Sequence, residues 1–280
     1  MSKVKRNQWI AFGLLSLATA FTIVILLAIL FYVMSQGLEM ISWEFLTENP
    51  RNMGAEGGIY PAILGTIYLV GMTLLIATPI GVGTAIYLNE YTREGPFKRT
   101  IRFTTEALAG IPSIVFGLFG FVFFVILLEP YTGGWSILSG SLTGVIMILP
   151  VIIRASEEAL RNVPNALREG SLALGTTRWY TIKKTVLPVA FPGILSSIIL
   201  SIGRVVGETA AFLLTLGGSL LLPRTIFDGS RTLSLHLYMV AMETGNMDMA
   251  LGTGAVLIIL VLIINFTAGF LFKRLVKRFS

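Results

Sequence analysis

Two ionisable residues, Arg204 and Glu208, interrupt an otherwise uncharged stretch and are the clearest candidates for chemistry in this sequence. Ionisable groups inside a membrane span are costly, and they usually face a partner or a water-filled path. Their spacing predicts one shared helix face, although Arg before Glu is the weaker order for an intrahelical ion pair. Two interpretations stay open. One is a mutual ion pair or a contact with another subunit; the other is a guanidinium whose forked donors meet a passing anion, with Glu208 tuning or holding it.

Other reactive residue types are scarce. The chain has no cysteine, which excludes disulfides, thiolate metal sites and cysteine nucleophiles. A single histidine, His236, is too little for a histidine metal cluster, and we expect it at a surface or interface of an outer loop. Glu106 is interpreted as an interfacial carboxylate. The sequence contains no Gly-x-x-x-x-Gly-Lys-Ser/Thr phosphate loop. We therefore expect no catalytic site, no ATPase site of its own and no cofactor.

The elements that carry these residues are predicted to lie in a membrane. Of the 280 residues, 54% are hydrophobic and 13% are charged, and the mean hydropathy is +0.81, which is too apolar for a soluble domain of this size. Charge-free runs long enough to cross a bilayer recur along the chain. They predict an all-α membrane protein, a single transmembrane domain over 1–280, with six helices at about 10–34, 62–88, 107–128, 137–153, 188–216 and 250–272.

The basic residues predict how these spans are oriented. With the N-terminus inside, seventeen of the 21 Lys and Arg fall in inner segments, while Arg51, Arg224 and Arg231 fall in outer ones and Arg204 lies in a span. An excess of Lys and Arg on the cytoplasmic side is the usual bias of multi-span proteins. The net charge of +6 therefore reflects topology, so both termini are expected in the cytoplasm and nucleic acid is not expected as a partner.

Proline and glycine mark irregular places in two spans. A kink is expected near Pro79 in the second span. Pro112 lies near the start of the third span, where a proline is tolerated if neighbouring helices or water satisfy the freed carbonyl. The third span is therefore expected to continue through Pro112.

The inner segment before the fifth span is much more polar than the rest and contains several helix-end signals. Ser156 can cap a helix whose first turn holds two glutamates. Pro164 suits the first turn of a second helix, and Gly175 suits the left-handed position just past its end. Thr176 or Thr177 can cap a third helix. The segment is therefore predicted to form three short helices joined by tight turns.

This coupling region, residues 154–187, resembles the EAA signature of ABC importer permeases. That signature is Glu-Ala-Ala, three residues, Gly, nine residues and Ile-x-Leu-Pro. Here the run EGSLALG, nine residues and TVLP keep the spacing, with small residues for the alanines and threonine for isoleucine. An amphipathic loop on lipid headgroups is the alternative, but spacing, side and position all favour docking. The resemblance implies docking to a cytoplasmic ATPase through Glu169, Gly170, Ser171, Leu172, Ala173, Leu174 and Gly175.

Three further stretches are similar to the phosphate permeases of the same family. They are residues 78–91, residues 110–120, and residues 203–215 with their Gly-Glu-Thr run. The resemblance implies a type I ABC importer permease fold with a cytoplasmic coupling helix. It also implies a permease subunit of an ATP-driven inorganic phosphate importer, which forms half of the translocation path. The substrate-path candidates within these stretches are Arg204, Glu208, Thr209 and Ser113.

The resemblance also implies the partners and the location. The chain would work in a prokaryotic cytoplasmic (inner) membrane with a second permease subunit, an ATPase dimer and an extracytoplasmic phosphate-binding protein. Another oxyanion cargo, molybdate, sulfate or tungstate, stays open because the binding protein usually fixes that choice. An ion-coupled secondary transporter is the other alternative. It would need intramembrane carboxylates and usually internal repeats, whereas only Glu208 lies well inside a span and no repeat is visible.

Small residues recur along the fifth predicted span. Small residues at four-residue spacing let membrane helices pack closely. We expect this face to meet the second permease subunit, and close packing within the chain is the alternative. The residues concerned are Ser197, Ser201, Gly203, Gly207 and Ala211.

Overall fold

The computed structural model describes residues 3–279, and most of its regular structure is helical. Within these residues, five helices are long and apolar enough to cross a membrane, or six if one bent helix pair is counted as a single span. The predicted orientation also depends on five basic residues whose side chains the structure does not describe: Lys3, Arg6, Lys273, Lys277 and Arg278.

The long helices are α1, α3, α7, α10 and α13. Their bounds are Lys3–Met40, Tyr60–Ile86, Ile137–Arg161, Leu187–Val206 and Met247–Phe279. The helix α3 continues as a π-helical turn, η2, over Tyr87–Tyr91. The bent pair consists of α4, Pro96–Ala109, and α5, Ser113–Gly120, which runs on into the π-helical η3, Phe121–Leu127.

The shorter elements lie at the two ends of the bundle. At one end lie α8, Asn165–Ala173, α9, Arg178–Thr181, and the π-helical η4, Ile182–Val186. The remaining short elements are α2 (Trp43–Thr47), β1 (Pro50–Arg51), η1 (Asn52–Gly54), β2 (Glu56–Gly57), α6 (Glu129–Thr132), α11 (Ala210–Thr215), α12 (Leu233–Met239) and η5 (Val240–Thr244). The strands β1 and β2 form a small antiparallel pair.

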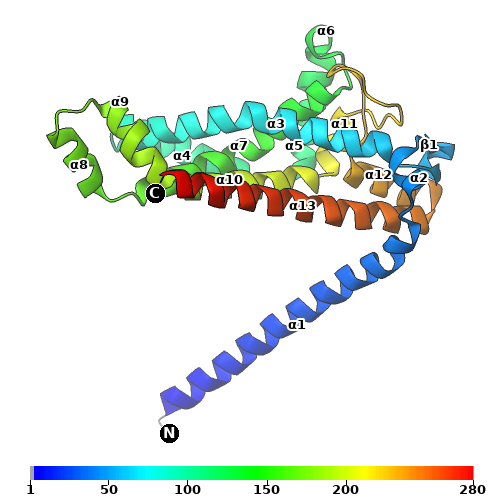
Figure 1. The fold of residues 1–280 in the computed structure, drawn as a ribbon, viewed down its shortest axis with the longest axis horizontal. Helices are drawn as coiled ribbons and strands as arrows, with labels where there is room; N and C mark the ends of the chain where they lie inside the picture. Colours follow the sequence, from blue (N-terminus) through cyan, green and yellow to red (C-terminus); the bar gives the residue numbers. More distant parts are fainter. Residues whose placement is uncertain (1–2, 280) are drawn as a thin grey trace.

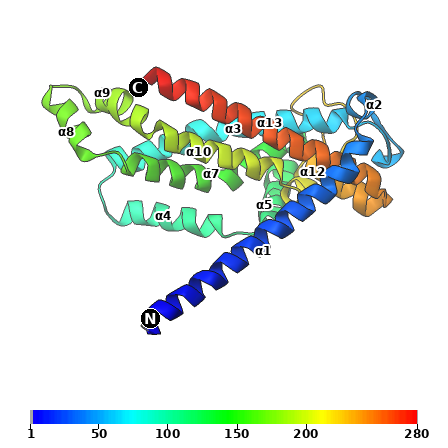
Figure 2. The same ribbon diagram turned by 60° about the horizontal axis from the view of Figure 1, so that its bottom comes forward.

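The helices α3, α7, α10 and α13 run side by side along the long axis of the molecule (Figures 1 and 2). We call the end that carries α8 and α9 the α8 end, and the end that carries α2 and α12 the α2 end. The helix α1 leaves the α2 end at an angle, and its N-terminus lies away from the bundle (Figure 1). Where its exposure is described, no residue of α1 before Gly37 is buried.

The helix α7 lies at the centre of the core because small residues let its neighbours approach closely. The core includes Leu69 of α3, Ile148 of α7 and Phe212 of α11, all fully buried. A Cβ on Gly81 would lie 2.6 Å from Ile152 Cγ2, so glycine is needed where α3 crosses α7. The bundle therefore depends on helix-to-helix contacts that larger side chains would prevent.

The third predicted span, 107–128, differs from the straight helix that was expected. The helices α4 and α5 meet at a bend of 101° around residues 110–112. Pro112 is extended, with φ −59° and ψ 141°, and a proline disfavours helical conformation in the residue before it. The expectation that the helix continues through Pro112 is therefore wrong. The first half instead reaches back to Pro96 and includes polar residues that were expected in a loop.

The fifth predicted span, 188–216, is also interrupted. The helix α10 ends at Val206 with Gly207 as its C-terminal cap, and α11 begins only at Ala210. Residues 207–209 form a short non-helical link between them. The predicted substrate-path residues lie at or next to these two breaks.

The predicted helix start at Ser156 is wrong. The helix α7 runs through this position to Arg161, so no new helix begins there. Ser156 is fully buried, and its Oγ lies 3.4 Å from Ser197 Oγ of α10. The helix α7 thus extends eight residues beyond the predicted span end, and the short helical elements of the coupling region are α8, α9 and η4.

Candidate docking helix and substrate path

Two tight turns shape the hairpin of α8 and α9 at the α8 end. Gly175 adopts the left-handed φ of +78° just past α8, as the sequence predicted. Thr177 caps α9, because its hydroxyl accepts a hydrogen bond from the Tyr180 amide at 3.2 Å. Figures 1 and 2 show α8 projecting beyond the ends of the long helices. These turns make a defined helix of what would otherwise be a loose loop.

The helix α8 offers an exposed surface. None of its residues is buried. Leu172 is 43% exposed, and Leu174, just past the helix, is 85% exposed. Leucines exposed outside the membrane-spanning helices are available to a partner protein. Of residues 169–175, only Ser171 is half-buried, and the other six are exposed. The predicted docking residues therefore lie together on one projecting element.

Arg168, which was not among the predicted site residues, holds this element to the bundle. Its Nη2 donates to Glu90 Oε1 at 2.9 Å and to the Leu160 carbonyl at 2.7 Å. Its Nη1 donates to the Val163 carbonyl at 2.6 Å. The two partners are 78 residues apart in the sequence, so no local pattern could indicate the pair. The only available signal was that both residues lie in stretches that resemble the permease family.

Arg204 lies on α10 at an open hollow of about 500 Å³. Gly203, Val151 of α7 and Asn265 of α13 line the same hollow. Asn265 was not among the predicted site residues, although a polar residue within an apolar helix is a signal for one. Among the described residues, no ion pair joins Arg204 to a carboxylate of this chain. Its forked donors therefore remain available to a ligand or to another subunit.

Glu208 does not share a helix face with Arg204. The expectation is wrong because α10 ends at Val206, which places Glu208 in the link between α10 and α11. Its Oε1 accepts a hydrogen bond from the Ala211 amide at 3.1 Å. A carboxylate at this position satisfies a free amide and complements the helix dipole. Glu208 thus acts within the chain as a cap for α11.

The other two path candidates stand at the starts of short helices. Ser113 is the first residue of α5, directly after the bend, and Thr209 is the N-terminal cap residue of α11. The helices α5 and α11 pack closely, because a Cβ on Gly117 would lie only 2.8 Å from Ala211 Cα. The two interrupted spans thus have their second halves packed together, which places Ser113 and Thr209 on neighbouring elements.

The small residues of the fifth predicted span divide into two groups. Ser197, Ser201 and Ala211 are buried within the chain, as the alternative interpretation has it. Gly203 and Gly207 are exposed. A Cβ on Gly203 would meet nothing within 4 Å, and one on Gly207 would meet only the carbonyl of Gly203. The expectation of one continuous face is wrong, and only the two glycines remain open to a partner.

Ion pairs join α4 to α7 near the α8 end. Glu106 of α4 pairs with Arg154 of α7 at 3.1 Å. Arg102 Nε donates to Glu157 Oε1 at 2.9 Å, and Glu157 is buried. Charge-assisted hydrogen bonds of this kind hold the polar half of the bent pair against the bundle. Glu106 is therefore a structural partner of Arg154.

His236 of α12 is fully buried, which corrects the expectation of a surface residue. It packs against Gly54, where a Cβ would lie 2.8 Å from the imidazole Cε1. Both ring nitrogens lack a hydrogen-bond partner among the described residues. Burial, with a smaller contribution from the charge of Arg231, lowers the pKa of His236 to about 4. The imidazole is therefore neutral at physiological pH.

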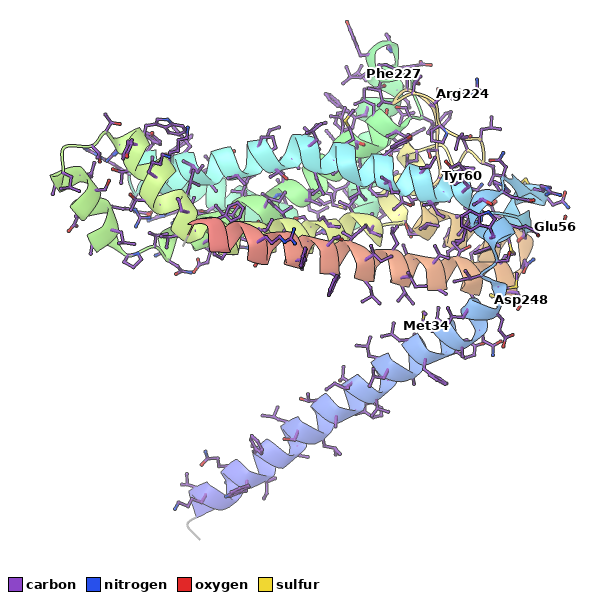
Figure 3. The ribbon with its side chains drawn as sticks, in the orientation of Figure 1. Met34, Glu56, Tyr60, Arg224, Phe227 and Asp248 are labelled. Atoms are coloured by element: carbon purple, nitrogen blue, oxygen red, sulfur yellow. The ribbon has the colours of Figure 1, made fainter. Side chains whose placement is uncertain are left out.

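Acidic and aromatic residues lie at the α2 end. Figure 3 shows Glu56, Tyr60 and Asp248 at this end, and Arg224 and Phe227 on the loop beside α6. An open pocket of about 460 Å³ is lined by several carboxylates, among them Glu44, Glu56 and Asp248. Phe227 is 50% exposed. This end thus offers a second surface with charged and apolar side chains, opposite the docking helix.

Comparison with known proteins agrees with this geometry. Residues 77–280 match the family described as "Binding-protein-dependent transport system inner membrane component". A bacterial alginate ABC transporter, solved with its alginate-bound periplasmic protein, has a chain of the same fold, with a TM-score of 0.72, 16% identity and 98% of each chain covered. The MetNI methionine ABC transporter has another, with a TM-score of 0.58 and 20% identity over 80% of this chain and 94% of that one. The fold is thus that of a type I ABC importer permease.

The chain belongs to this family of inner membrane components. It is 41% identical to the phosphate transport system permease protein PstA 1 of Mycobacterium tuberculosis, over 76% of this chain and 70% of that protein. It is 37% identical to the phosphate transport system permease protein PstA of Mycobacterium leprae, over 96% of this chain and 90% of that protein. It is also 35% identical to the probable ABC transporter permease protein YqgI of Bacillus subtilis, over 99% of this chain and 98% of that protein.

Proposed function

We propose that the chain is a PstA-type permease subunit of an ATP-driven inorganic phosphate importer. One observation supports ATP as the energy source: the projecting helix α8 contains the residues that are expected to dock on an ATPase, and none of its residues is buried. The cargo is supported by the PstA relatives, which are similar over most of this chain. The sister subunit PstC is the other assignment within the same importer.

The importer would need three further components. We assign the α8 end to the cytoplasm, where a PstB-like ATPase dimer docks on α8 and supplies the hydrolysis that this chain lacks. The α2 end then faces a PstS-like phosphate-binding protein outside an inner membrane, and its exposed Phe227 and its carboxylates would lie at that contact. A PstC-like permease completes the translocation path. Both termini would lie in the cytoplasm, and lipid would cover the apolar surface.

Transport would follow alternating access. ATP binding closes the ATPase dimer and draws the docking helices together, which opens the path outward. Phosphate then enters from the binding protein, and reopening of the dimer lets it pass inward. The bias comes from ATP, which binds the two states of the complex with different affinity.

Arg204 is our assignment for a phosphate contact in this path. It faces an open hollow, and no carboxylate of the described residues pairs with it. A guanidinium matches the geometry of phosphate with two parallel donors. Ser113 and Thr209 would add hydroxyl groups where the spans are interrupted. Glu208 would act indirectly, because it holds the start of α11.

A competition measurement tests the cargo. The chain is reconstituted with its three partner components, and uptake of labelled phosphate is measured in the presence of unlabelled phosphate, sulfate or molybdate. Only unlabelled phosphate should compete. Stronger competition by sulfate or molybdate would favour the other oxyanion assignment, and uptake that follows an ion gradient would favour a secondary transporter.

A further inference from the structure

Few side chains connect the docking helix to the rest of the chain. Within α8, all of whose residues are described, only Arg168 and Ser171 are not exposed. Ser171 Oγ lies 2.9 Å from the Thr176 hydroxyl and 3.0 Å from the Thr181 hydroxyl. These contacts tie α8 to α9, its neighbour in the hairpin. Arg168 makes a contact of another kind, because it reaches across to the long helices.

Arg168 binds the ends of two spans at once. Glu90 belongs to η2 at the end of α3, whereas Leu160 and Val163 belong to the last turn of α7 and to the link after it. The side chains of Arg168 and Glu90 are 16% and 9% exposed, so water and salt screen this ion pair little. Asn89 Nδ2 also donates to Glu90 Oε1, at 2.7 Å, which fixes the carboxylate.

We propose that the Arg168–Glu90 ion pair transmits the movement of α8 to α3 and α7 during transport. The proposal rests on the proposed function, since it assumes that an ATPase docks on α8. A guanidinium that binds a carboxylate and two carbonyls fixes both the position and the direction of the helix, which one hydrogen bond could not do.

The packing of α8 explains why one ion pair matters so much. The helix buries no apolar side chain, and its neighbours in the hairpin, α9 and η4, lead into α10 alone, so no core contact links it to α3 or α7. Without Arg168, α8 would remain joined through Ser171 to α9, which continues through η4 into α10, but it would lose its bonds to the ends of α3 and α7. Arg168 is thus a positioning residue that acts through Glu90.

The test compares hydrolysis with transport in the same vesicles. Arg168→Gln and Glu90→Gln, alone and together, are reconstituted with the partner subunits, and ATP hydrolysis and phosphate uptake are measured. ATP hydrolysis should stay within about twofold, whereas uptake per ATP should fall about tenfold, the factor that corresponds to about 1.4 kcal/mol of lost coupling. The double variant should be no worse than Arg168→Gln, because that single substitution already removes the ion pair as well as the bonds to Leu160 and Val163.

Arg99→Gln is the matched control, since Arg99 is an exposed arginine of α4. Unchanged uptake per ATP in Glu90→Gln, or losses that add in the double variant, would overturn the proposal. If Arg168→Gln does not assemble, Glu90→Gln decides, because it leaves the bonds of Arg168 to Leu160 and Val163 in place. Failure of the proposed function would show separately, as an unmodified complex that takes up no phosphate.

Discussion

At the scale of single residues, Arg204 and Glu208 have different surroundings although they are four positions apart. Arg204 faces an open hollow on α10, whereas Glu208 caps α11 through the Ala211 amide. The sequence placed both in one helix, because nothing in the run Gly-Glu-Thr indicates that the helix stops. The break turns one polar pair into two separate functions, a candidate anion contact and a helix cap.

Substitution of Arg204 tests the anion contact. Arg204→Gln should lower phosphate uptake by about tenfold or more, since a hydrogen bond to a charged group contributes about 1.5–3 kcal/mol. Arg204→Lys should keep part of the activity, because it preserves the charge but loses the forked geometry. Uptake is measured at equal membrane levels, with Arg99→Gln as the control. Normal uptake by Arg204→Gln would exclude the contact.

Substitution of Glu208 tests the helix cap. Glu208→Ala should lower the unfolding midpoint of the purified chain, because loss of an N-terminal cap costs about 1 kcal/mol. Glu208→Gln keeps an acceptor oxygen, so its unfolding midpoint should fall less than that of Glu208→Ala. A thermal scan in detergent at neutral pH measures both. Equal midpoints for Glu208→Ala and the unmodified chain would show that the cap contributes nothing.

His236 predicts a dependence of stability on pH. Its folded pKa of about 4 lies below the ordinary value of 6.5, so between these values the unfolded chain binds a proton that the folded chain does not. The neutral His236 therefore contributes roughly 3 kcal/mol to the free energy of unfolding above pH 6.5, and this contribution is lost as the pH falls toward 4.

His236→Leu should remove this part of the pH dependence. It should also leave the unfolding midpoint at pH 7.5 unchanged or higher, since neither ring nitrogen has a partner among the described residues. Midpoints are measured at pH 7.5 and 4.5 for both chains. If the unfolding midpoint falls between pH 7.5 and pH 4.5 as much in His236→Leu as in the unmodified chain, His236 is not the source of this pH dependence.

At the scale of elements, two exposed glycines predict a subunit contact: Gly203 of α10 and Gly207, the C-terminal cap of that helix. Leucine at Gly203 and Gly207 should leave the single chain folded, because the space beside both is open, but should prevent close packing with the second permease. Co-purification of the two permeases measures this. Gly71→Leu on α3 is the matched control, since Gly71 is also exposed with open space. An intact heterodimer with both leucines would count against the contact.

The sequence predicted helix ends well where residue type alone decides the local conformation, although it left Thr176 and Thr177 both open as the cap of α9. Gly175 and Thr177 have the conformations that residue type suggests, because a left-handed glycine and a hydroxyl cap are local properties. The bend at Pro112 was missed, since residue type alone does not decide whether a proline is tolerated or ends a helix. The Arg168–Glu90 pair and the burial of His236 were also missed. Both depend on tertiary packing between distant segments, which charge and hydropathy do not encode.

At the scale of the whole molecule, the two ends of the bundle carry different surfaces. The α8 end presents a projecting helix with exposed leucines, whereas carboxylates lie at the α2 end and Phe227 lies on the loop beside α6 (Figures 1 and 3). Between them, α7 and its neighbours form a core that joins both ends. Such an arrangement fits a subunit that connects events on one side of a membrane to a path on the other.

The most direct test of the central claim is ATP-driven phosphate uptake by the complete complex. The chain is reconstituted in proteoliposomes with the second permease and the ATPase, with ATP inside and the binding protein and labelled phosphate outside. Uptake should require ATP, and it should be abolished when the projecting surface is altered by Leu172→Asp and Leu174→Asp, because a charge on each exposed leucine would prevent docking. Uptake that continues without ATP, or that survives both substitutions, would contradict the account.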